Sequence, residues 1–315
     1  MEHYPALTIA AAGTGRRRWL GFVLALGIAL LGSLVPRPGL AEESDADSEQ
    51  IHCRAMKWIR YKDQAKAALT VPIMLNGRLE WFQLDTGTPY TMLHGEQLAR
   101  DYGAASASQS RLEIEDVRLA GVDLGRRTLH VLGDHEPNEN YSGTLGLDML
   151  MGHLVILNFP DQRFCMIEDA LPSEAMMRRT LWAKGVLRDG HLFFDINFGD
   201  HVLSDVLFDT GSSNIALWVD HPAWSQMTGI DDPENAAQLR EGMNWGRKIT
   251  MAGAPAKNRL RLGPIPFRSQ IVSTAVEQPD FFNGFANGLF GNAPFFGDIV
   301  VLSLGPTPAL GVIRR

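Results

Sequence analysis

The chain has 315 residues, of which 45% are hydrophobic and 21% charged, so it can bury a sizeable core and is globular rather than intrinsically disordered. Its 29 basic and 36 acidic residues give a net charge of −7, which argues against a nucleic acid as its partner. The histidines are scattered and neither CxxC nor HExxH occurs, so we expect no metal site and no cofactor.

The first 41 residues differ from the rest of the chain. Arg16, Arg17 and Arg18 precede an apolar run at residues 19–35, and the stretch Gly39-Leu40-Ala41 that follows ends in a small residue. This order predicts a secretory signal peptide, but the apolar run is also just long enough for an uncleaved signal-anchor. In both cases we expect the body of the protein to be exported, periplasmic or extracellular, either soluble after cleavage or anchored in the membrane through residues 19–35.

The segment at residues 42–51 is acidic and polar, and we expect a disordered tether there. Without residues 1–41 the chain carries 25 basic and 35 acidic residues, a net charge of −10, because four arginines and one glutamate are removed. Cys53 and Cys165 are the only cysteines. In an exported protein they form one disulfide, unless they are two separate small buried residues, and the sequence leaves both possibilities open.

An internal repeat organises the chain from residue 73 onward. Each copy has an apolar segment, a turn that contains glycine, a second apolar segment and then Asp-Thr-Gly, at 85–87 and 209–211. The Asp-Thr-Gly sequences are 124 residues apart, whereas the closing segments Gly143–Gly146 and Gly288–Gly291 are 145 apart. The second copy therefore has 21 more residues, which fall mainly within 219–259.

The segments of the repeat are short, rich in β-branched and aromatic residues, and bounded by Gly, Pro or Asn, which predicts strands and tight turns. Helical patterns are few, at residues 96–101, in the linker at 173–183 and in the insertion, where Asp232 can start a helix. We therefore predict an all-β, bilobal fold of two β-barrel-like lobes that are related by a pseudo-twofold axis and separated by a cleft. The predicted parts are an N-terminal lobe at 52–170, a linker at 171–184 and a C-terminal lobe at 185–315.

Two Asp-Thr-Gly turns at equivalent places of a duplicated lobe indicate a paired site, although one such turn alone would be a weak signal. If the lobes meet about a twofold axis, Asp85 and Asp209 face each other and share one proton, because two close carboxylates do not both ionise easily. The ionised carboxylate then activates a water that attacks a carbonyl carbon, and the protonated one donates to the carbonyl oxygen. Because one chain supplies both aspartates, we expect activity as a monomer.

The other residues of the two turns have predicted supporting roles. Glycines allow the backbone to approach the carboxylates and to donate N–H groups, and the first threonine of each turn is expected to hydrogen-bond across the lobe interface. The hydroxyls that follow are expected to donate to the carboxylates and shift activity toward acidic pH, unless they only cap the turns. The glycines are Gly87 and Gly211, the threonines are Thr86 and Thr210, and the hydroxyls that follow belong to Thr88 and Ser212.

These motifs, Leu84–Thr88 and Phe208–Ser213, resemble those of retropepsin-like and pepsin-like aspartic proteases. The closing segment Gly143–Leu150 (GTLGLDML) is especially similar to that of bacterial retropepsin-like domains, and the resemblance covers nearly all of residues 65–315. It implies the acid-protease fold, a polypeptide substrate in the cleft, endopeptidase activity, and Asp85 and Asp209 as catalytic residues. The alternative is an exported, catalytically silent peptide-binding protein on the same fold.

The sequence departs from the family in two places, the segment that covers the cleft and the second closing segment. The family covers its cleft with a glycine-rich hairpin, the flap, for which the first copy offers a poor match. The insertion of the second copy is a better flap candidate, with Trp245 and Gly246 near its tip, unless Trp245 packs the insertion onto the lobe. Pro294 leaves the local shape of the second closing segment open.

A basic stretch at residues 57–66 (KWIRYKDQAK) has two interpretations. It is a solvated loop that leads into the first strand, or it is an inhibitory prosegment whose lysine pairs with the catalytic carboxylates.

Overall fold

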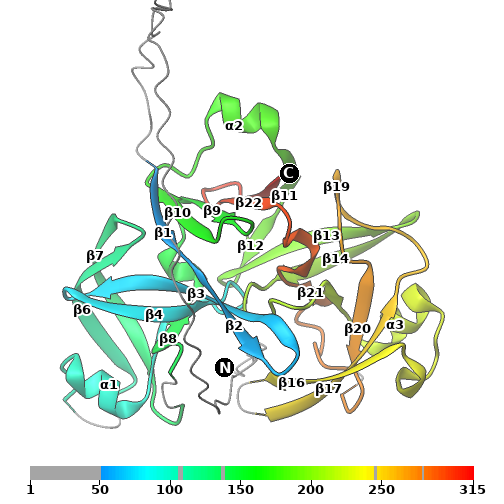
Figure 1. Cartoon of the computed structure of the whole chain (residues 1–315), viewed down its shortest axis with the longest axis horizontal. Helices are drawn as coiled ribbons and strands as arrows, with labels where there is room; N and C mark the ends of the chain where they lie inside the picture. Colours follow the sequence, from blue (N-terminus) through cyan, green and yellow to red (C-terminus); the bar gives the residue numbers. More distant parts are fainter. Residues whose placement is uncertain (1–50, 106–108, 136–138, 245–246, 279) are drawn as a thin grey trace, which may run out of the picture. The chain divides into compact units, whose positions relative to one another are not determined.

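The computed structural model describes residues 51–105, 109–135, 139–244, 247–278 and 280–315 (Figure 1). The predicted signal or anchor segment, the tether up to residue 50, and the flap candidates Trp245 and Gly246 lie outside the described residues. Within the described ranges, no helix is both long and apolar enough to cross a membrane.

The N-terminal lobe is a seven-stranded sheet in the order β2-β3-β4-β8-β5-β7-β6. An additional pairing of β3 with β6 closes the sheet on itself, which makes the lobe barrel-like. A short helix, α1 (Glu96–Asp101), follows β5 at the position that the sequence predicted. The strands are β2 (Lys57–Tyr61), β3 (Gln64–Leu75), β4 (Arg78–Leu84), β5 (Met92–His94), β6 (Arg111–Leu119), β7 (Val122–Leu132) and β8 (Gly143–Leu145).

The C-terminal lobe repeats this arrangement in a ten-stranded sheet, in the order β16-β17-β20-β15-β21-β14-β13-β18-β19, with β12 paired to β13. The strand before each Asp-Thr-Gly pairs in parallel with the closing strand, β4 with β8 and β14 with β21. The strands are β12 (Val186–Arg188), β13 (His191–Phe198), β14 (His201–Phe208), β15 (Leu217–Trp218), β16 (Gln238–Asn244), β17 (Arg247–Pro255), β18 (Leu260–Leu262), β19 (Ile265–Pro266), β20 (Ile271–Ala275) and β21 (Gly288–Phe290).

A third sheet joins the lobes in the order β1-β10-β9-β22-β23-β11, with three strands from each side. Its central antiparallel pair aligns Ile156 with Val301, which are 145 residues apart, the same offset as between the closing segments of the repeat. Equivalent residues therefore face each other on the pseudo-twofold axis. The strands are β1 (His52–Ala55), β9 (Leu154–Asn158), β10 (Arg163–Ile167), β11 (Leu181–Lys184), β22 (Ile299–Ser303) and β23 (Ala309–Ile313). The predicted all-β, bilobal acid-protease fold is thus confirmed.

The linker between the lobes is only half helical, which corrects the helical pattern expected at residues 173–183. Helix α2 (Glu174–Arg179) begins at Ser173, whose hydroxyl accepts a hydrogen bond from the Met176 N–H, and the chain then becomes strand β11. Pairing of Leu181–Lys184 with β23 overrides the local helical preference, because it completes the edge of the interlobe sheet.

A disulfide joins Cys53 and Cys165, which are opposite each other on the paired strands β1 and β10. It closes a loop with a sequence separation of 112 residues. Replacement of both cysteines by serine is expected to lower the free energy of unfolding by about 2–5 kcal/mol, because the unfolded chain loses this constraint. Denaturant unfolding with and without reductant measures the loss, and a wild-type protein that is equally stable in reductant would contradict it.

The insertion of the second copy consists of helix α3 (His221–Thr228), a short 3₁₀ turn at Pro233–Asn235 and the β16–β17 hairpin. Asp232 starts the 3₁₀ turn, where its carboxylate accepts a hydrogen bond from the Glu234 N–H. The hairpin pairs seven residues on each side, from Gln238 with Gly253 to Asn244 with Arg247. The part of the chain that was expected to supply a flap therefore is a β-hairpin.

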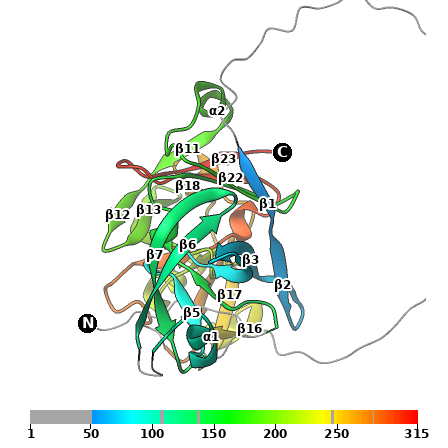
Figure 2. The same cartoon turned by 90° about the vertical axis from the view of Figure 1, so that its left-hand side faces the viewer.

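The basic stretch at residues 57–66 is neither a loop nor a segment that pairs a lysine with Asp85 or Asp209. It forms most of the β2–β3 hairpin, whose tip lies against the C-terminal lobe (Figures 1 and 2). Lys62 forms an ion pair with Glu241 of β16, and the Asn214 side-chain amide donates a hydrogen bond of 2.6 Å to Gln64. Lys57 and Lys66 lie over the rings of Trp81 and Phe296. The lysines of this stretch are therefore engaged away from the aspartates.

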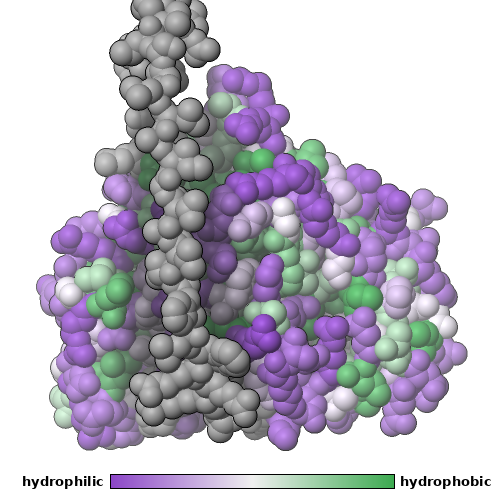
Figure 3. All heavy atoms as spheres, in the orientation of Figure 1, coloured by the Kyte–Doolittle hydropathy of each residue, from purple (hydrophilic) through white to green (hydrophobic). Residues whose placement is uncertain are grey.

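On the face drawn in Figure 3, the described residues form no large apolar patch, and hydrophilic residues predominate. The exposed large apolar side chains belong to several elements, for example Leu79 on β4, Leu171 before α2 and Val202 on β14. Scattered residues of this kind are normal on a folded protein and carry no functional meaning.

Candidate active site

The two Asp-Thr-Gly turns begin where two buried parallel strand pairs end. β4 ends at Leu84 and β14 ends at Phe208, one residue before each aspartate. The Asp85 N–H donates to the Leu145 carbonyl at 3.0 Å, and the Asp209 N–H donates to the Phe290 carbonyl at 2.9 Å. Each closing strand thus holds the backbone of the aspartate in its own lobe.

Crossed hydrogen bonds between Thr86 and Thr210 tie the two turns together. The backbone N–H of each threonine donates to the hydroxyl of the other, at 3.0 Å and 3.1 Å. Each hydroxyl in turn donates at 2.9 Å to a carbonyl of the opposite lobe, Thr86 to Phe208 and Thr210 to Leu84. All these groups are buried. The two threonines therefore lie where the sequence expected them, and they set the distance between the lobes.

Glycine is required at the third position of both turns because the opposite aspartate lies directly against it. A Cβ atom on Gly87 would lie 2.6 Å from Cγ of Asp209, and one on Gly211 would lie 2.6 Å from Cγ of Asp85. No real Cβ tolerates such distances. The same contacts show that each carboxyl group sits beside the turn of the other lobe.

The two carboxyl groups have unequal hydrogen-bond donors. Asp209 accepts from the Gly211 N–H at 2.8 Å, from the Ser212 N–H at 3.3 Å and from the Ser212 hydroxyl at 2.6 Å. Asp85 accepts from the Gly87 N–H at 2.9 Å, and its Oδ2 atom has no donor among the described residues. Hydrogen bonds to a carboxylate favour its ionised form, so Asp209 is the better stabilised anion.

The electrostatics of the pair agree with this difference. Burial and the nearby Asp209 carboxylate raise the pKa of Asp85 well above its ordinary value. Burial also raises the pKa of Asp209, but the Ser212 hydroxyl and the N–H groups of its turn oppose the rise. These effects favour the protonated form at Asp85 more than at Asp209, and the pair titrates as a unit.

Thr88 and Ser212 differ, which corrects the expectation that both hydroxyls donate to a carboxylate. Ser212 donates to Asp209, whereas the Thr88 hydroxyl turns to the Tyr90 carbonyl, at 3.4 Å. Thr88 precedes Pro89, which restricts the backbone of the residue before it, and no such restriction acts on Ser212. The first turn therefore lacks the hydroxyl that the second turn supplies.

Replacement of Ser212 by alanine is expected to move the acidic limb of the pH–activity profile to higher pH. The Ser212 hydroxyl lowers the pKa of Asp209, so its loss makes the ionised form harder to reach, and activity then fades earlier as the pH falls. Profiles of kcat/KM against pH measure the shift. Thr88→Ala is the matched control and should leave the acidic limb in place. Equal shifts in the two variants would refute the assignment.

The closing segments reach the turns through a glycine in each copy. A Cβ on Gly146 would lie 2.4 Å from the backbone of Tyr90, and one on Gly291 would lie 1.9 Å from the Ser212 carbonyl oxygen. Pro294 enters the first turn of a 3₁₀ helix at Ala293–Phe295, the counterpart of a 3₁₀ helix at Leu147–Met149. Proline is well tolerated there, so the closing segment keeps its shape.

Asn292 and His191 also contact the site and were not identified from the sequence. The buried amide of Asn292 donates to the Thr210 carbonyl and to the Ser213 hydroxyl, both at 3.0 Å. His191 is half-buried, and burial lowers the pKa of its imidazole, opposed by the Asp189 carbonyl, the Asp209 charge and the Gly87 backbone. Asn292 stands directly after the closing glycine, which is a usable signal. No spacing pattern points to His191.

The carboxyl groups of the pair are buried, since Asp85 and Asp209 are both 0% exposed. Over the described ranges, no cluster of three or more His, Cys, Asp or Glu side chains is arranged to hold a metal ion.

The chain resembles solved structures that are distant in sequence. Conglutin gamma, a basic 7S globulin from lupine seeds, matches with a TM-score of 0.49 and 8% identity over 85% of this chain and 95% of its own. A retropepsin-like aspartic protease from Rickettsia conorii matches with a TM-score of 0.27 and 15% identity over 37% of this chain and 91% of its own. No family model and no curated protein matches the sequence. The assignment of the site therefore rests on the geometry of this chain.

Proposed function

We propose that the protein is an aspartic endopeptidase that hydrolyses peptide bonds with a water activated between Asp85 and Asp209. The observation that carries the proposal is the intact, twofold-related pair of Asp-Thr-Gly turns, in which the carboxyl groups are buried together and the turns are joined by crossed threonine hydrogen bonds. A purely structural turn would have no need for two juxtaposed carboxyl groups, which are costly to bury.

The unequal hydrogen bonding of the two carboxyl groups suggests a role for each. Asp209, which has three donors, is the ionised partner and takes a proton from water. Asp85, which holds the shared proton, donates it to the carbonyl oxygen of the substrate as the water oxygen attacks the carbonyl carbon. Collapse of the tetrahedral intermediate breaks the C–N bond, and the amine leaves with a proton returned by the pair. No covalent intermediate forms.

The complete burial of the aspartates favours one alternative, a catalytically silent peptide-binding protein on the same fold. In that case the cleft never admits a peptide bond to the pair, although peptides still bind at its edges. The two functions differ in a direct way, because only the protease releases new peptide termini.

The test is digestion of an unfolded polypeptide by the purified protein, without residues 1–41, across acidic and neutral pH. Mass spectrometry of the products identifies new termini, and the Asp85→Asn, Asp209→Asn double variant is the control for contaminating proteases. A peptide whose scissile carbonyl is replaced by a tetrahedral hydroxyl group should block cleavage. Products that are equal in the wild type and the double variant would reject the protease.

We also propose that the protein acts as a monomer outside the cytoplasm, either free in the periplasm or extracellular space or anchored through residues 19–35. The single chain that supplies both aspartates supports the monomer. The arginine-apolar order of the N-terminal residues and the Cys53–Cys165 disulfide support export.

A further inference from the structure

We propose that a pocket under the β16–β17 hairpin is a substrate subsite that selects acidic side chains, with Arg240 as the residue that binds the carboxylate. This inference rests on the proposed peptide-binding cleft and adds the class of side chain that the cleft prefers.

The pocket lies beside the catalytic turn of the C-terminal lobe. Asn214, Ile215 and Ala216, which line it, follow Asp209 by five to seven residues. Gln64, near the tip of the β2–β3 hairpin, lies beside Asn214 and also lines the pocket. Its volume is about 150 Å³. Small-molecule sites usually measure roughly 300–1,000 Å³, so this pocket is sized for one side chain of a longer ligand.

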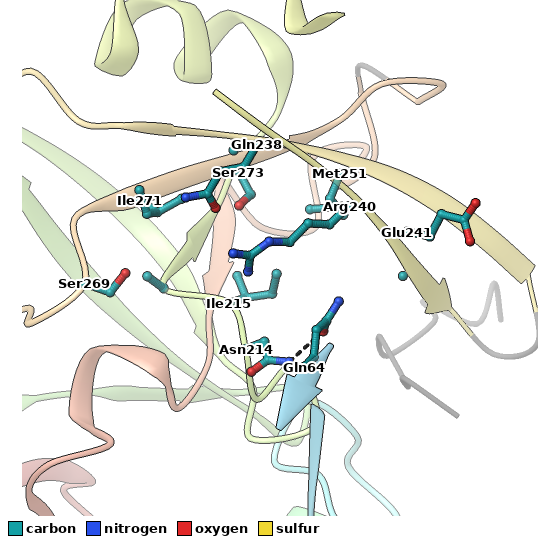
Figure 4. A pocket seen from close by; sticks show the side chains of 13 residues that line it. Gln64, Asn214, Ile215, Gln238, Arg240, Glu241, Met251, Ser269, Ile271 and Ser273 are labelled. Carbon is teal, nitrogen blue, oxygen red and sulfur yellow. Dashed lines mark hydrogen bonds between the residues drawn. The ribbon is translucent and has the colours of Figure 1, made fainter. Parts of the chain in front are cut away.

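Arg240 points into the pocket from strand β16 (Figure 4). Side chains alternate along a strand, so Gln238 and Arg240 share the inner face, whereas Leu239 and Glu241 point the other way. Arg240 pairs with Met251 of β17, whose buried side chain also lines the pocket. The guanidinium therefore enters the pocket from the hairpin that covers it.

Two charged residues, Arg240 and Glu241, line the pocket, and only Glu241 has an ion-pair partner among the described residues. Glu241 is engaged by Lys62 in an ion pair, and Lys248 lies close enough to lower the pKa of Glu241 further. Asp63 also acts on Lys62. In the part of the chain that the structure describes, Arg240 has no carboxylate partner. The Arg240 guanidinium is therefore the charged group of the lining that is left to meet a ligand.

Neutral polar groups also line the pocket. The hydrogen bond from Asn214 to Gln64 holds both amides in place, and Gln238 and Ser273 add further polar atoms (Figure 4). A carboxylate that enters would gain the Arg240 guanidinium, which forms strong bidentate hydrogen bonds with carboxylates. A lysine or arginine side chain would meet the Arg240 charge instead. The pocket therefore discriminates by charge.

The test compares peptides that differ only by Glu, Gln or Lys at successive positions on either side of the cleavage site. We expect the wild type to prefer Glu over Gln by roughly tenfold in kcat/KM at one position, because a charge-assisted hydrogen bond is worth about that factor. High salt should remove the preference, because it screens the charge of Arg240. Arg240→Gln should remove the preference, and Arg240→Glu should reverse it toward Lys. Lys248→Gln is the matched control, because Lys248 is in the same hairpin on the opposite face with Glu241.

A binding arm separates this proposal from the proposed activity. The same peptides, fluorescently labelled, are titrated into the Asp85→Asn, Asp209→Asn protein, with and without Arg240→Gln. If no peptide is cleaved by the wild type but Glu peptides bind more tightly in an Arg240-dependent way, the protease is rejected and the acidic subsite is supported. Equal binding of Glu and Gln peptides, or a Glu preference that survives Arg240→Gln, would overturn the subsite.

Discussion

Replacement of either Asp85 or Asp209 by asparagine should lower kcat/KM for peptide hydrolysis by at least about 10²–10⁴-fold, the usual contribution of a general acid or base. Each variant removes one of the two proton-transfer functions, and asparagine keeps nearly the same shape. The loss should be equally deep in both single variants and in the double variant, because the pair acts as a unit. Initial rates with a fluorogenic peptide measure it.

The Asp85→Asn variant is expected to unfold at higher temperature at neutral pH. Burial and the partner charge raise the pKa of Asp85, so its protonated form stabilises the folded state below the ordinary pKa, and that stability is lost as the pH rises through the raised value. Asparagine stays neutral at every pH. A gain of about 1 kcal/mol raises Tm by roughly 2–4 °C.

Asp195→Asn, at an exposed position of β13, is the control for this gain in stability and should leave Tm unchanged. A fall in Tm of the Asp85 variant together with its activity would mean that misfolding explains the loss. A stable variant that cleaves peptides normally would reject the catalytic role of the pair.

Removal of one threonine hydroxyl between the lobes should cost about 2–6 kcal/mol of stability. Thr210→Val leaves both the Thr86 N–H and the Leu84 carbonyl buried without their partner, and each unsatisfied group costs about 1–3 kcal/mol. The same contact sets the spacing of the two carboxyl groups. We therefore expect kcat/KM to fall by more than the fraction of unfolded protein alone would explain. Denaturant unfolding and kcat/KM are measured on the same preparation.

Thr210→Ser keeps the hydroxyl and is the matched control for this variant. The corresponding cycle of Thr86→Val, Thr210→Val and the double variant should show strong coupling, because both hydroxyls belong to one network. Additive losses, or a valine variant as stable as the serine variant, would show that the crossed hydrogen bonds do not hold the lobes.

Much of the site could be predicted because duplication made it visible. One Asp-Thr-Gly is ambiguous, but the matching offsets of the turns and closing segments placed Asp85 and Asp209 as equivalents, and the pairing of Ile156 with Val301 shows the same symmetry in three dimensions. The threonine contacts also followed from this equivalence. What repeats in the sequence repeats in the fold.

Features that break the symmetry could not be predicted. The hydroxyl of Thr88 turns away from Asp85, the stretch at 57–66 forms a hairpin, and Arg240 faces inward, because each depends on contacts between segments far apart in the chain. The β2–β3 hairpin contacts residues 150 or more positions later, at Asn214 and Glu241. Local sequence propensity does not predict contacts between such distant residues.

The sheet that joins the lobes has a consequence for how the protein folds. Its first strand, β1, and its strand β23 belong to opposite ends of the described chain, and its centre joins β9 with β22. Neither lobe can complete its hydrogen bonding at this sheet until the last residues have been synthesised. Non-local pairing of this kind is slow to form and leaves strand edges exposed during folding. The nascent N-terminal lobe should therefore depend on chaperone protection until the C-terminal strands arrive.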